Sequence, residues 1–179
     1  MGHDPSDHAL LVRWRNEPHV ARWWSTDDEP SPITLEHVVE TYGPRTDPGS
    51  DATSCVIELG ERPIGYIQFY RWGSFAEVAR AMGMAVHEDA FGIDVFVGEP
   101  DLIGRGIGSR AVDLLTRHLF DERGASQVAI VTALDNHVAQ RAYEKAGFHR
   151  VGEVLDTDVR DGERVRSWLM TRETRELPS

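Results

Sequence analysis

Apolar residues follow two spacings along the chain, one typical of helices and one typical of strands. A spacing of three to four residues predicts helices over 7–15, 18–24, 34–42, 110–123 and 136–146. Alternating or continuous apolar runs predict strands over 53–59, 63–72, 92–98, 127–132, 148–155 and 163–172. Residues 43–51 are interpreted as a polar linker, and the mixed segment 73–90 as a short helix or a mobile lid.

The order of these elements is helix-rich first, then a hairpin, then strand, helix, strand, helix, strand, strand. Such an order favours an α/β fold with one mixed central β-sheet and helices on its faces. The length of 179 residues suits a single domain, 1–179, in which residues 173–179 form a frayed tail.

A glycine-rich turn follows the central strand and leads into the longest helix. Gly104, Gly106 and Gly108 occupy alternate positions where that helix begins. Glycine allows the backbone to turn sharply and to approach a ligand, and the first helical turn offers free N–H groups at the positive end of the helix dipole. The turn therefore predicts a binding site for an anion such as phosphate.

Two known phosphate-binding patterns do not fit this turn. The NTPase loop has a lysine directly before its hydroxyl residue, whereas Gly108 precedes Ser109, and the dinucleotide pattern Gly-x-Gly-x-x-Gly is spaced differently. Taken alone, the turn also remains compatible with an ordinary helix cap.

A second motif lies in the next helix, where Asn136 and Tyr143 are two turns apart and share one side. Asn-x-x-Ala-x-x-x-Tyr-x-x-x-Gly-Phe, preceded by the glycine-rich turn, resembles the GNAT superfamily of N-acetyltransferases. One departure is Ile103, where the superfamily usually has Gln or Arg. Superfamily members often begin with a strand, and this chain begins too late for one, so we expect a sheet without it or a trimmed start.

The resemblance implies the GNAT fold and acetyl-CoA as the co-substrate. Backbone groups near the end of the central strand would meet the oxyanion, the glycine-rich turn would hold the pyrophosphate, and Asn136 would bind the pantetheine arm. The cofactor-binding residues that it implies are Phe96, Val97, Ile103, Gly104, Arg105, Gly106, Ile107, Gly108, Ser109 and Asn136.

Asp94 is the anomaly of the central strand, because its neighbours are apolar. A bare buried carboxylate costs several kcal/mol, so Asp94 is expected to be hydrogen-bonded, paired with an arginine, or used in chemistry.

Within the superfamily, the chain is most similar to the aminoglycoside 6′-N-acetyltransferases, over residues 23–24, 63–68, 92–94 and 142–148. Such enzymes acetylate a sugar amine of a cationic antibiotic and confer resistance. The similarity implies that Asp94 removes the amine proton, directly or through water, and that Tyr143 acts as the general acid, since a tyrosine with a pKa of about 10 holds its proton at neutral pH. Tyr143 can alternatively be simple packing beside Phe148.

Aromatic and acidic side chains supply candidate substrate contacts. Adjacent tryptophans on a helix point about 100 degrees apart, so at least one is expected to face a pocket unless the pair plugs a helix end. Alternation places Tyr66 and Gln68 on one strand face, as a substrate wall or a solvent-facing ladder. The predicted substrate-binding residues are Trp23, Trp24, Tyr66, Gln68, Glu88, Asp89 and Asp94.

The charge balance disfavours a nucleic-acid partner. With 19 basic and 30 acidic side chains, the formal net charge is −11, which favours a cationic small ligand, although solubility alone explains acidity equally well.

No apolar run approaches the roughly 20 residues of a membrane span and no leader opens the chain, so we expect a cytoplasmic protein without membrane contact. The eight histidines show no metal-ligand spacing, so no metal site is predicted. A monomer and a homodimer both remain open.

Two alternative functions remain. A siderophore-type lysine or hydroxylysine N-acyltransferase would share the tryptophan helix and the glycine-rich turn, and would need an apolar acyl channel. A non-catalytic acyl-CoA sensor or aminoglycoside-binding protein would keep residues 104–108 but would need neither Asp94 nor Tyr143.

Overall fold

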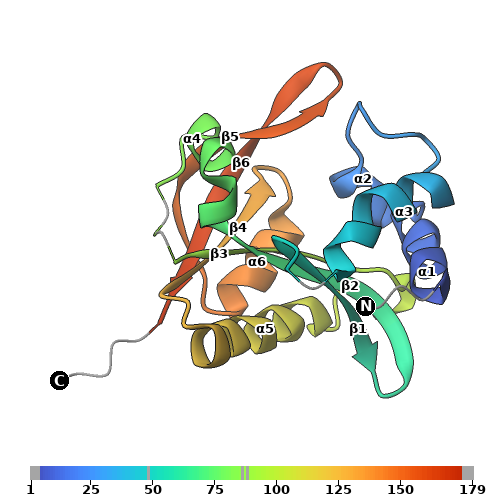
Figure 1. Ribbon diagram of the computed structural model, residues 1–179, viewed down its shortest axis with the longest axis horizontal. Coiled ribbons are helices and arrows are strands. Elements are labelled where there is room, and N and C mark those ends of the chain that lie inside the picture. Colours follow the sequence, from blue (N-terminus) through green and yellow to red (C-terminus); the bar gives the residue numbers. More distant parts are fainter. Residues whose placement is uncertain (1–4, 48, 86, 88, 175–179) are drawn as a thin grey trace.

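The computed structural model describes residues 5–47, 49–85, 87 and 89–174 (Figure 1). The α-helices are α1 (Pro5–Arg15), α2 (Pro18–Trp24), α3 (Leu35–Tyr42), α4 (Ala76–Ala81), α5 (Ile107–Arg123) and α6 (His137–Lys145). The strands are β1 (Ala52–Leu59), β2 (Arg62–Arg71), β3 (Phe91–Val97), β4 (Gln127–Ala133), β5 (His149–Arg160) and β6 (Glu163–Glu173). Short 3-10 turns are η1 (Gly43–Thr46), η2 (Trp72–Phe75) and η3 (Pro100–Leu102).

The strands form one mixed sheet in the order β1-β2-β3-β4-β6-β5. All neighbours pair antiparallel except β3 and β4, which are parallel. Their pairing consists of Phe91 with Val128 and Gly92 with Ala129. Beyond these pairs the two central strands separate, so the sheet opens between 94–97 and 130–133.

Helices cover both faces of the sheet. Helix α5 packs Val112 and Leu119 in one core cluster with Ile93 of β3, whereas α1, α2 and α3 share a second cluster with Phe96. Residues 93 and 96 point to opposite faces of a strand, so the two clusters lie on opposite sides of the sheet. In Figure 1, α1–α3 gather on one side of the molecule and α4 lies beside β5 and β6 on the other.

Local sequence signals set several helix ends as predicted. Pro18 opens α2, the Thr34 hydroxyl accepts the N–H of His37 at the start of α3, and Gly124 ends α5 with a φ of 66°. The expected α/β class and mixed sheet are confirmed. No helix in the described part of the chain is long and apolar enough to cross a membrane.

Several predicted boundaries were wrong. Segment 73–90 does hold a short helix, α4, but the supposed linker 43–51 contains the turn η1. Strand β5 continues to Arg160, past its predicted end at 155, because Val159 and Arg160 pair with β6 again after a register shift that follows Leu155. Glu173 belongs to β6 and not to a frayed tail, while residues 175–179 lie outside the described residues.

The segment that leaves β3 is anchored to α1. The indole nitrogen of Trp14 donates to Glu99 at 2.8 Å, and Glu99 also accepts from Arg13 at 2.5 Å and from Arg62 at 2.9 Å. These three charge-assisted contacts lower the pKa of Glu99 to about 2, with the Trp14 hydrogen bond as the largest cause. The tie fixes the chain just before the glycine-rich turn.

Gly98 provides the first test of this anchor. A Cβ at this position would lie 2.2 Å from Cγ of Trp14, so Gly98→Ala must displace the indole or the backbone. We expect Gly98→Ala to lower the free energy of unfolding by about 1–3 kcal/mol, the usual cost of overpacking, in urea titration. Gly152→Ala is the matched control, because nothing lies within 4 Å of its added Cβ. Equal stability of the two variants would contradict the anchor.

Candidate functional site

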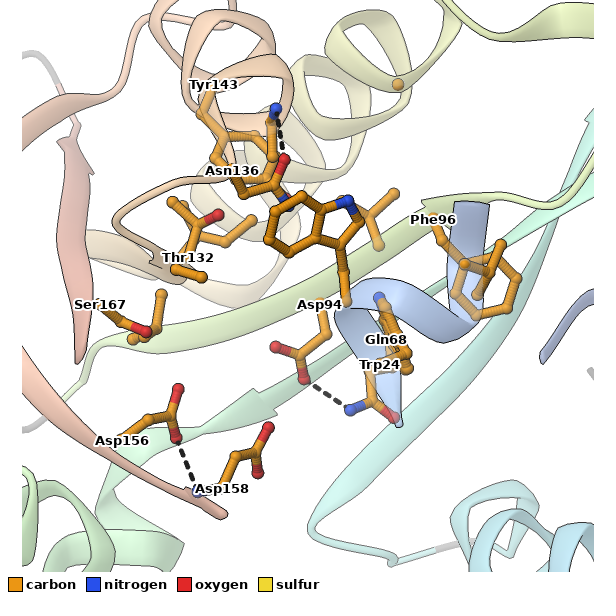
Figure 2. Close-up of a pocket in the computed structure, with 18 of the residues that line it drawn as sticks. Trp24, Gln68, Asp94, Phe96, Thr132, Asn136, Tyr143, Asp156, Asp158 and Ser167 are labelled. Atoms are coloured by element: carbon orange, nitrogen blue, oxygen red, sulfur yellow. Dashed lines mark hydrogen bonds between the residues drawn. The ribbon is translucent and has the colours of Figure 1, made fainter. Parts of the chain in front are cut away.

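A cavity of about 1190 Å³ opens where β3 and β4 separate. Both strands contribute lining residues, and further residues come from helices α2, α5 and α6, strands β2, β5 and β6, and the turns η1 and η2. Figure 2 shows side chains from these elements turned toward one shared space. The cavity therefore joins the glycine-rich turn to the acidic residues of the sheet.

The glycine-rich turn forms one end of the cavity. Gly104 and Gly106 have φ angles of 75° and 78°, the left-handed region that favours glycine, and space is open around both. The first backbone bond into α5 runs from the Arg110 N–H to the Gly106 carbonyl at 3.1 Å, so the three N–H groups of 107–109 precede the helical ladder. This geometry fits a diphosphate at the positive end of a 17-residue helix.

Nine of the ten predicted cofactor-binding residues line the cavity. They are Phe96, Val97, Ile103, Gly104, Gly106, Ile107, Gly108, Ser109 and Asn136. The tenth, Arg105, has an exposed side chain that does not line the cavity.

Asn136 has a structural task besides the predicted one. Its side-chain oxygen accepts the N–H of Ala139 at 3.2 Å and so caps α6. Because the oxygen is used in the cap, the amide NH₂ is the group of Asn136 that can donate to a ligand. Beside it, buried Gln140 donates to the carbonyls of Ala133 and Leu134, each at 2.9 Å, and holds the turn between β4 and α6.

Asp94 lies in the middle of the cavity at the end of a hydrogen-bonded chain. Gln68 donates from Nε2 to the Asp94 carboxylate at 2.6 Å, and the Gln68 oxygen accepts from Arg45 and from the Tyr66 hydroxyl. Burial raises the pKa of Asp94, while the Gln68 hydrogen bond and the charge of Arg45 oppose the rise. Asp94 is thus a fixed carboxylate with increased proton affinity.

Tyr143 faces the same region from α6 (Figure 2). It is 7% exposed, and burial raises the pKa of its hydroxyl, with the nearby Asp94 charge raising it further. The hydroxyl is therefore protonated at neutral pH. Asp94 and Tyr143 therefore line the same cavity, and their predicted catalytic roles stay a prediction.

Two further carboxylates, Asp156 and Asp158, were missed by sequence reasoning. Both line the cavity from β5, and Figure 2 shows them turned toward the space in front of Asp94. Burial raises the pKa of both, and the Asp156 charge helps to bring the pKa of Asp158 to about 6, although Arg160 lies 3.8 Å away. Their spacing of two residues would place both carboxylates on one face of a strand, but the strand was predicted to end before them.

Arg45 was also missed, because it belongs to the supposed linker. It lines the cavity and donates to Gln68 from η1, and its guanidinium stacks 4.7 Å from the Tyr42 ring. No local pattern marks a residue whose role depends on a contact 23 positions away.

The predicted substrate-binding residues divide into two groups. Trp23, Trp24 and Gln68 line the cavity, and Trp24 packs edge-on against Phe96 at 4.8 Å. Tyr66 does not: it is fully buried beneath the α1–α3 layer, and its hydroxyl bonds Ser54 and Gln68.

The structure does not place the acidic residues just before β3 at the cavity, where they were predicted to bind the substrate. Asp89 accepts from Ser126 at 2.6 Å and is not part of the cavity wall. Glu88 lies outside the described residues. The acidic wall in front of Asp94 comes instead from β5.

The arrangement can join two ligands of opposite charge. The helix terminus suits an anion, and the three aspartates suit a cation. Between these ends, Asp94 can take a proton from a bound group and Tyr143 can supply one. The geometry is thus that of a transfer site for two substrates.

Known proteins share this chain's sequence pattern. Residues 4–155 match the family model described as an acetyltransferase (GNAT) domain. A protein of Klebsiella pneumoniae named aminoglycoside N(6′)-acetyltransferase type 1 is 32% identical over 157 residues, which cover 85% of this chain and 74% of that protein. These matches confirm the resemblance drawn from the glycine-rich turn and the Asn136–Phe148 segment.

Solved structures share the fold. Aminoglycoside acetyltransferase AAC(6′)-Ib in complex with coenzyme A and kanamycin superposes with a TM-score of 0.75 at 28% identity, covering 97% of this chain and 91% of that one. AAC(6′)-Ib in complex with ribostamycin and coenzyme A gives a TM-score of 0.78 at 27% identity, covering 99% and 96%.

The pKa of Asp158 predicts a stability change. A carboxyl whose pKa rises from 3.8 in the unfolded chain to about 6 on folding opposes folding above pH 6 and does so less as the pH falls toward 4. Asp158→Asn should therefore raise the melting temperature at pH 7.5 by about 2–4 °C. The gain should shrink as the pH falls toward 4 in scanning calorimetry. Asp121→Asn, on the exposed surface of α5, is the charge-matched control, and a loss of stability on changing Asp158 would contradict this account.

Proposed function

The chain belongs to the GNAT acetyltransferase family, and we propose that it transfers the acetyl group of acetyl-CoA to the 6′-amine of an aminoglycoside. The observation that carries this proposal is the position of Asp94, between a helix terminus that fits a diphosphate and an acidic wall that fits a polyamine. The relatives named above acetylate or bind such antibiotics.

Acetyl-CoA supplies an activated acyl group and a sulfur leaving group. The N–H groups of 107–109 would hold its diphosphate, and the Asn136 amide would donate to the pantetheine arm. The glycine at 106 caps α5 without a side chain, which leaves room for the phosphates.

Asp94 has the chemistry of the general base. An amine at neutral pH is mostly protonated and cannot attack a thioester, so its proton must leave first. The raised pKa of Asp94 increases its affinity for that proton, and Gln68 holds the carboxylate in one orientation. The proton passes to the Asp94 carboxylate oxygen, directly or through water.

Tyr143 has the chemistry of the general acid. Burial and the charge of Asp94 keep its hydroxyl protonated, so Oη can give its proton to the departing sulfur. The free amine would then attack the thioester carbonyl and form the C–N bond, and the C–S bond would break as Tyr143 protonates the sulfur. The nitrogen would give its second proton to the tyrosinate, which leaves a neutral amide and restores the Tyr143 hydroxyl.

The acidic wall accounts for a substrate with several amines. Partial burial raises the pKa of Asp156 and of Asp158, and the charge of Asp156 raises that of Asp158 further. Cationic amines would stabilise the ionised forms of both. A lysine-type acceptor offers fewer positive charges to this wall, and a non-catalytic binding protein has no use for the Asp94 and Tyr143 pair.

Release of coenzyme A tests the proposal directly. The purified protein with acetyl-CoA should turn over kanamycin and tobramycin, and mass spectrometry with NMR should locate the acetyl group on the 6′-nitrogen. Turnover of lysine or hydroxylysine derivatives in their place would favour the siderophore-type alternative. Binding of either ligand without turnover would favour a non-catalytic role.

Asp94→Asn should lower kcat by roughly ten-fold or more, because the amide cannot take the amine proton. In the unaltered enzyme, kcat/KM should fall on the acid side as Asp94 becomes protonated, at a pH above the ordinary range of an aspartate. That acid limb should disappear in Asp94→Asn. Asp121→Asn, which removes the same charge from the surface, should leave the profile in place, and an unchanged rate for Asp94→Asn would remove the base assignment.

Tyr143→Phe keeps the buried ring and removes only the hydroxyl. We expect kcat to fall by roughly ten-fold or more while the affinity for coenzyme A, measured by calorimetry, stays within about two-fold. A full-rate variant would reduce Tyr143 to a packing residue. A loss confined to coenzyme A affinity would assign the hydroxyl to binding.

A further inference from the structure

Buried polar atoms without a partner in the protein mark places where a ligand or a water molecule can supply the missing hydrogen bond. Within the described ranges, six buried side-chain atoms have no hydrogen-bond partner: His8 Nε2, Arg15 Nε, Trp72 Nε1, Thr116 Oγ1, Arg160 Nε and Ser167 Oγ. The two arginines bond through other nitrogens, and His8 and Thr116 lie outside the cavity wall. Trp72 and Ser167 are the neutral pair of this group that lines the cavity.

Ser167 lies in the acceptor half of the cavity. It is 0% exposed and sits on β6 between Ala133 of β4 and Val154 of β5. The irregular stretch of β5 that carries Asp156 and Asp158 begins just after Leu155, the next paired residue on that strand. Figure 2 shows Ser167 pointing from its strand toward the space that Asp94 and Asp156 also face.

The wall therefore offers two kinds of recognition. The three aspartates attract any molecule with several amines, whether a linear polyamine or an amino sugar. The aspartates already supply charged acceptors for ammonium groups, whereas a neutral hydroxyl can both donate to and accept from a hydroxyl group. A buried hydroxyl that finds no partner destabilises its site, so a ligand that supplies the partner is favoured.

We propose that Ser167 binds a ring hydroxyl of the acceptor, on the sugar that carries the reacting amine, and so selects amino sugars over linear polyamines; this rests on the function proposed above. A linear polyamine places methylene groups where an amino sugar places hydroxyls. A site built to hydrogen-bond a hydroxyl discriminates strongly against an analogue that lacks it, because the protein group is then left unpaired. Trp72 adds a donor on the same cavity wall, with its indole 4% exposed and packed edge-on against Tyr70.

Substrate analogues that lack single hydroxyls allow a double-mutant cycle, in which Ser167 is changed in the protein and one hydroxyl is removed from the substrate, so that the interaction between the two groups is measured. Kanamycin B, its 3′-deoxy analogue tobramycin and the 3′,4′-dideoxy analogue form such a series, with spermidine as the linear polyamine. Ser167→Ala should lower kcat/KM roughly ten-fold for kanamycin B and by less than about two-fold for the analogue that lacks the bound hydroxyl. The preference for kanamycin B over spermidine should shrink by the same roughly ten-fold factor.

Thr116→Val is the matched control, because it removes an equally buried and unpaired hydroxyl that does not line the cavity. It should change kcat/KM equally for all four substrates. Ser167→Cys leaves no space where the hydroxyl was and offers only a weak donor, so it should shift selectivity as the alanine does and serves if Ser167→Ala does not fold.

The outcomes separate the two proposals. An equal loss across the series for Ser167→Ala, the result expected if solvent alone satisfies the hydroxyl, overturns the role of Ser167 and leaves the proposed function standing. Failure of the unaltered enzyme to acetylate any aminoglycoside overturns the proposed function, and the role of Ser167 with it.

Discussion

The separation of β3 from β4 is the constraint on which the rest of the structure depends. Parallel pairing stops at Gly92 and Ala129, and the strands then leave each other inside an otherwise continuous sheet. A central strand that loses one partner would normally expose its backbone groups at a cost. Here the loss creates a cavity whose walls are rigid strands, so the groups on them keep fixed positions. Asp94 on β3 and Thr132 on β4 both face this space as a result.

The chemistry of the cavity is held by contacts that span long stretches of sequence. Gln68 is suited to its place because an amide offers a donor to Asp94 and an acceptor to Arg45 and Tyr66 at the same time. The hydrogen bond from Trp14 to Glu99 connects the layer of α1–α3 to the segment between β3 and the glycine-rich turn. The anion-binding end and the acidic end are therefore parts of one connected scaffold.

The sequence was sufficient for features that depend on neighbouring residues. The glycine-rich turn and the helix caps follow from local spacing, whereas Asp94 and Tyr143 were assigned their roles through the resemblance to the GNAT superfamily. Asp156, Asp158 and Arg45 could not be found in this way, because an irregular strand pairing and a 3-10 turn bring them to the site. Tyr66 shows the opposite limit: alternation gives the face of a strand correctly, but does not say where a helical layer stops covering that face.

The crowding of three carboxylates in a partly buried wall has a consequence for how the protein meets its ligands. Each of these carboxyls holds its proton to a higher pH than a fully solvated aspartate does, since the pKa values of Asp94, Asp156 and Asp158 are all raised. A polycation that enters drives some of these protons off. Ligand capture and proton release are then one coupled equilibrium, and the heat of association depends on the ionisation enthalpy of the surrounding buffer.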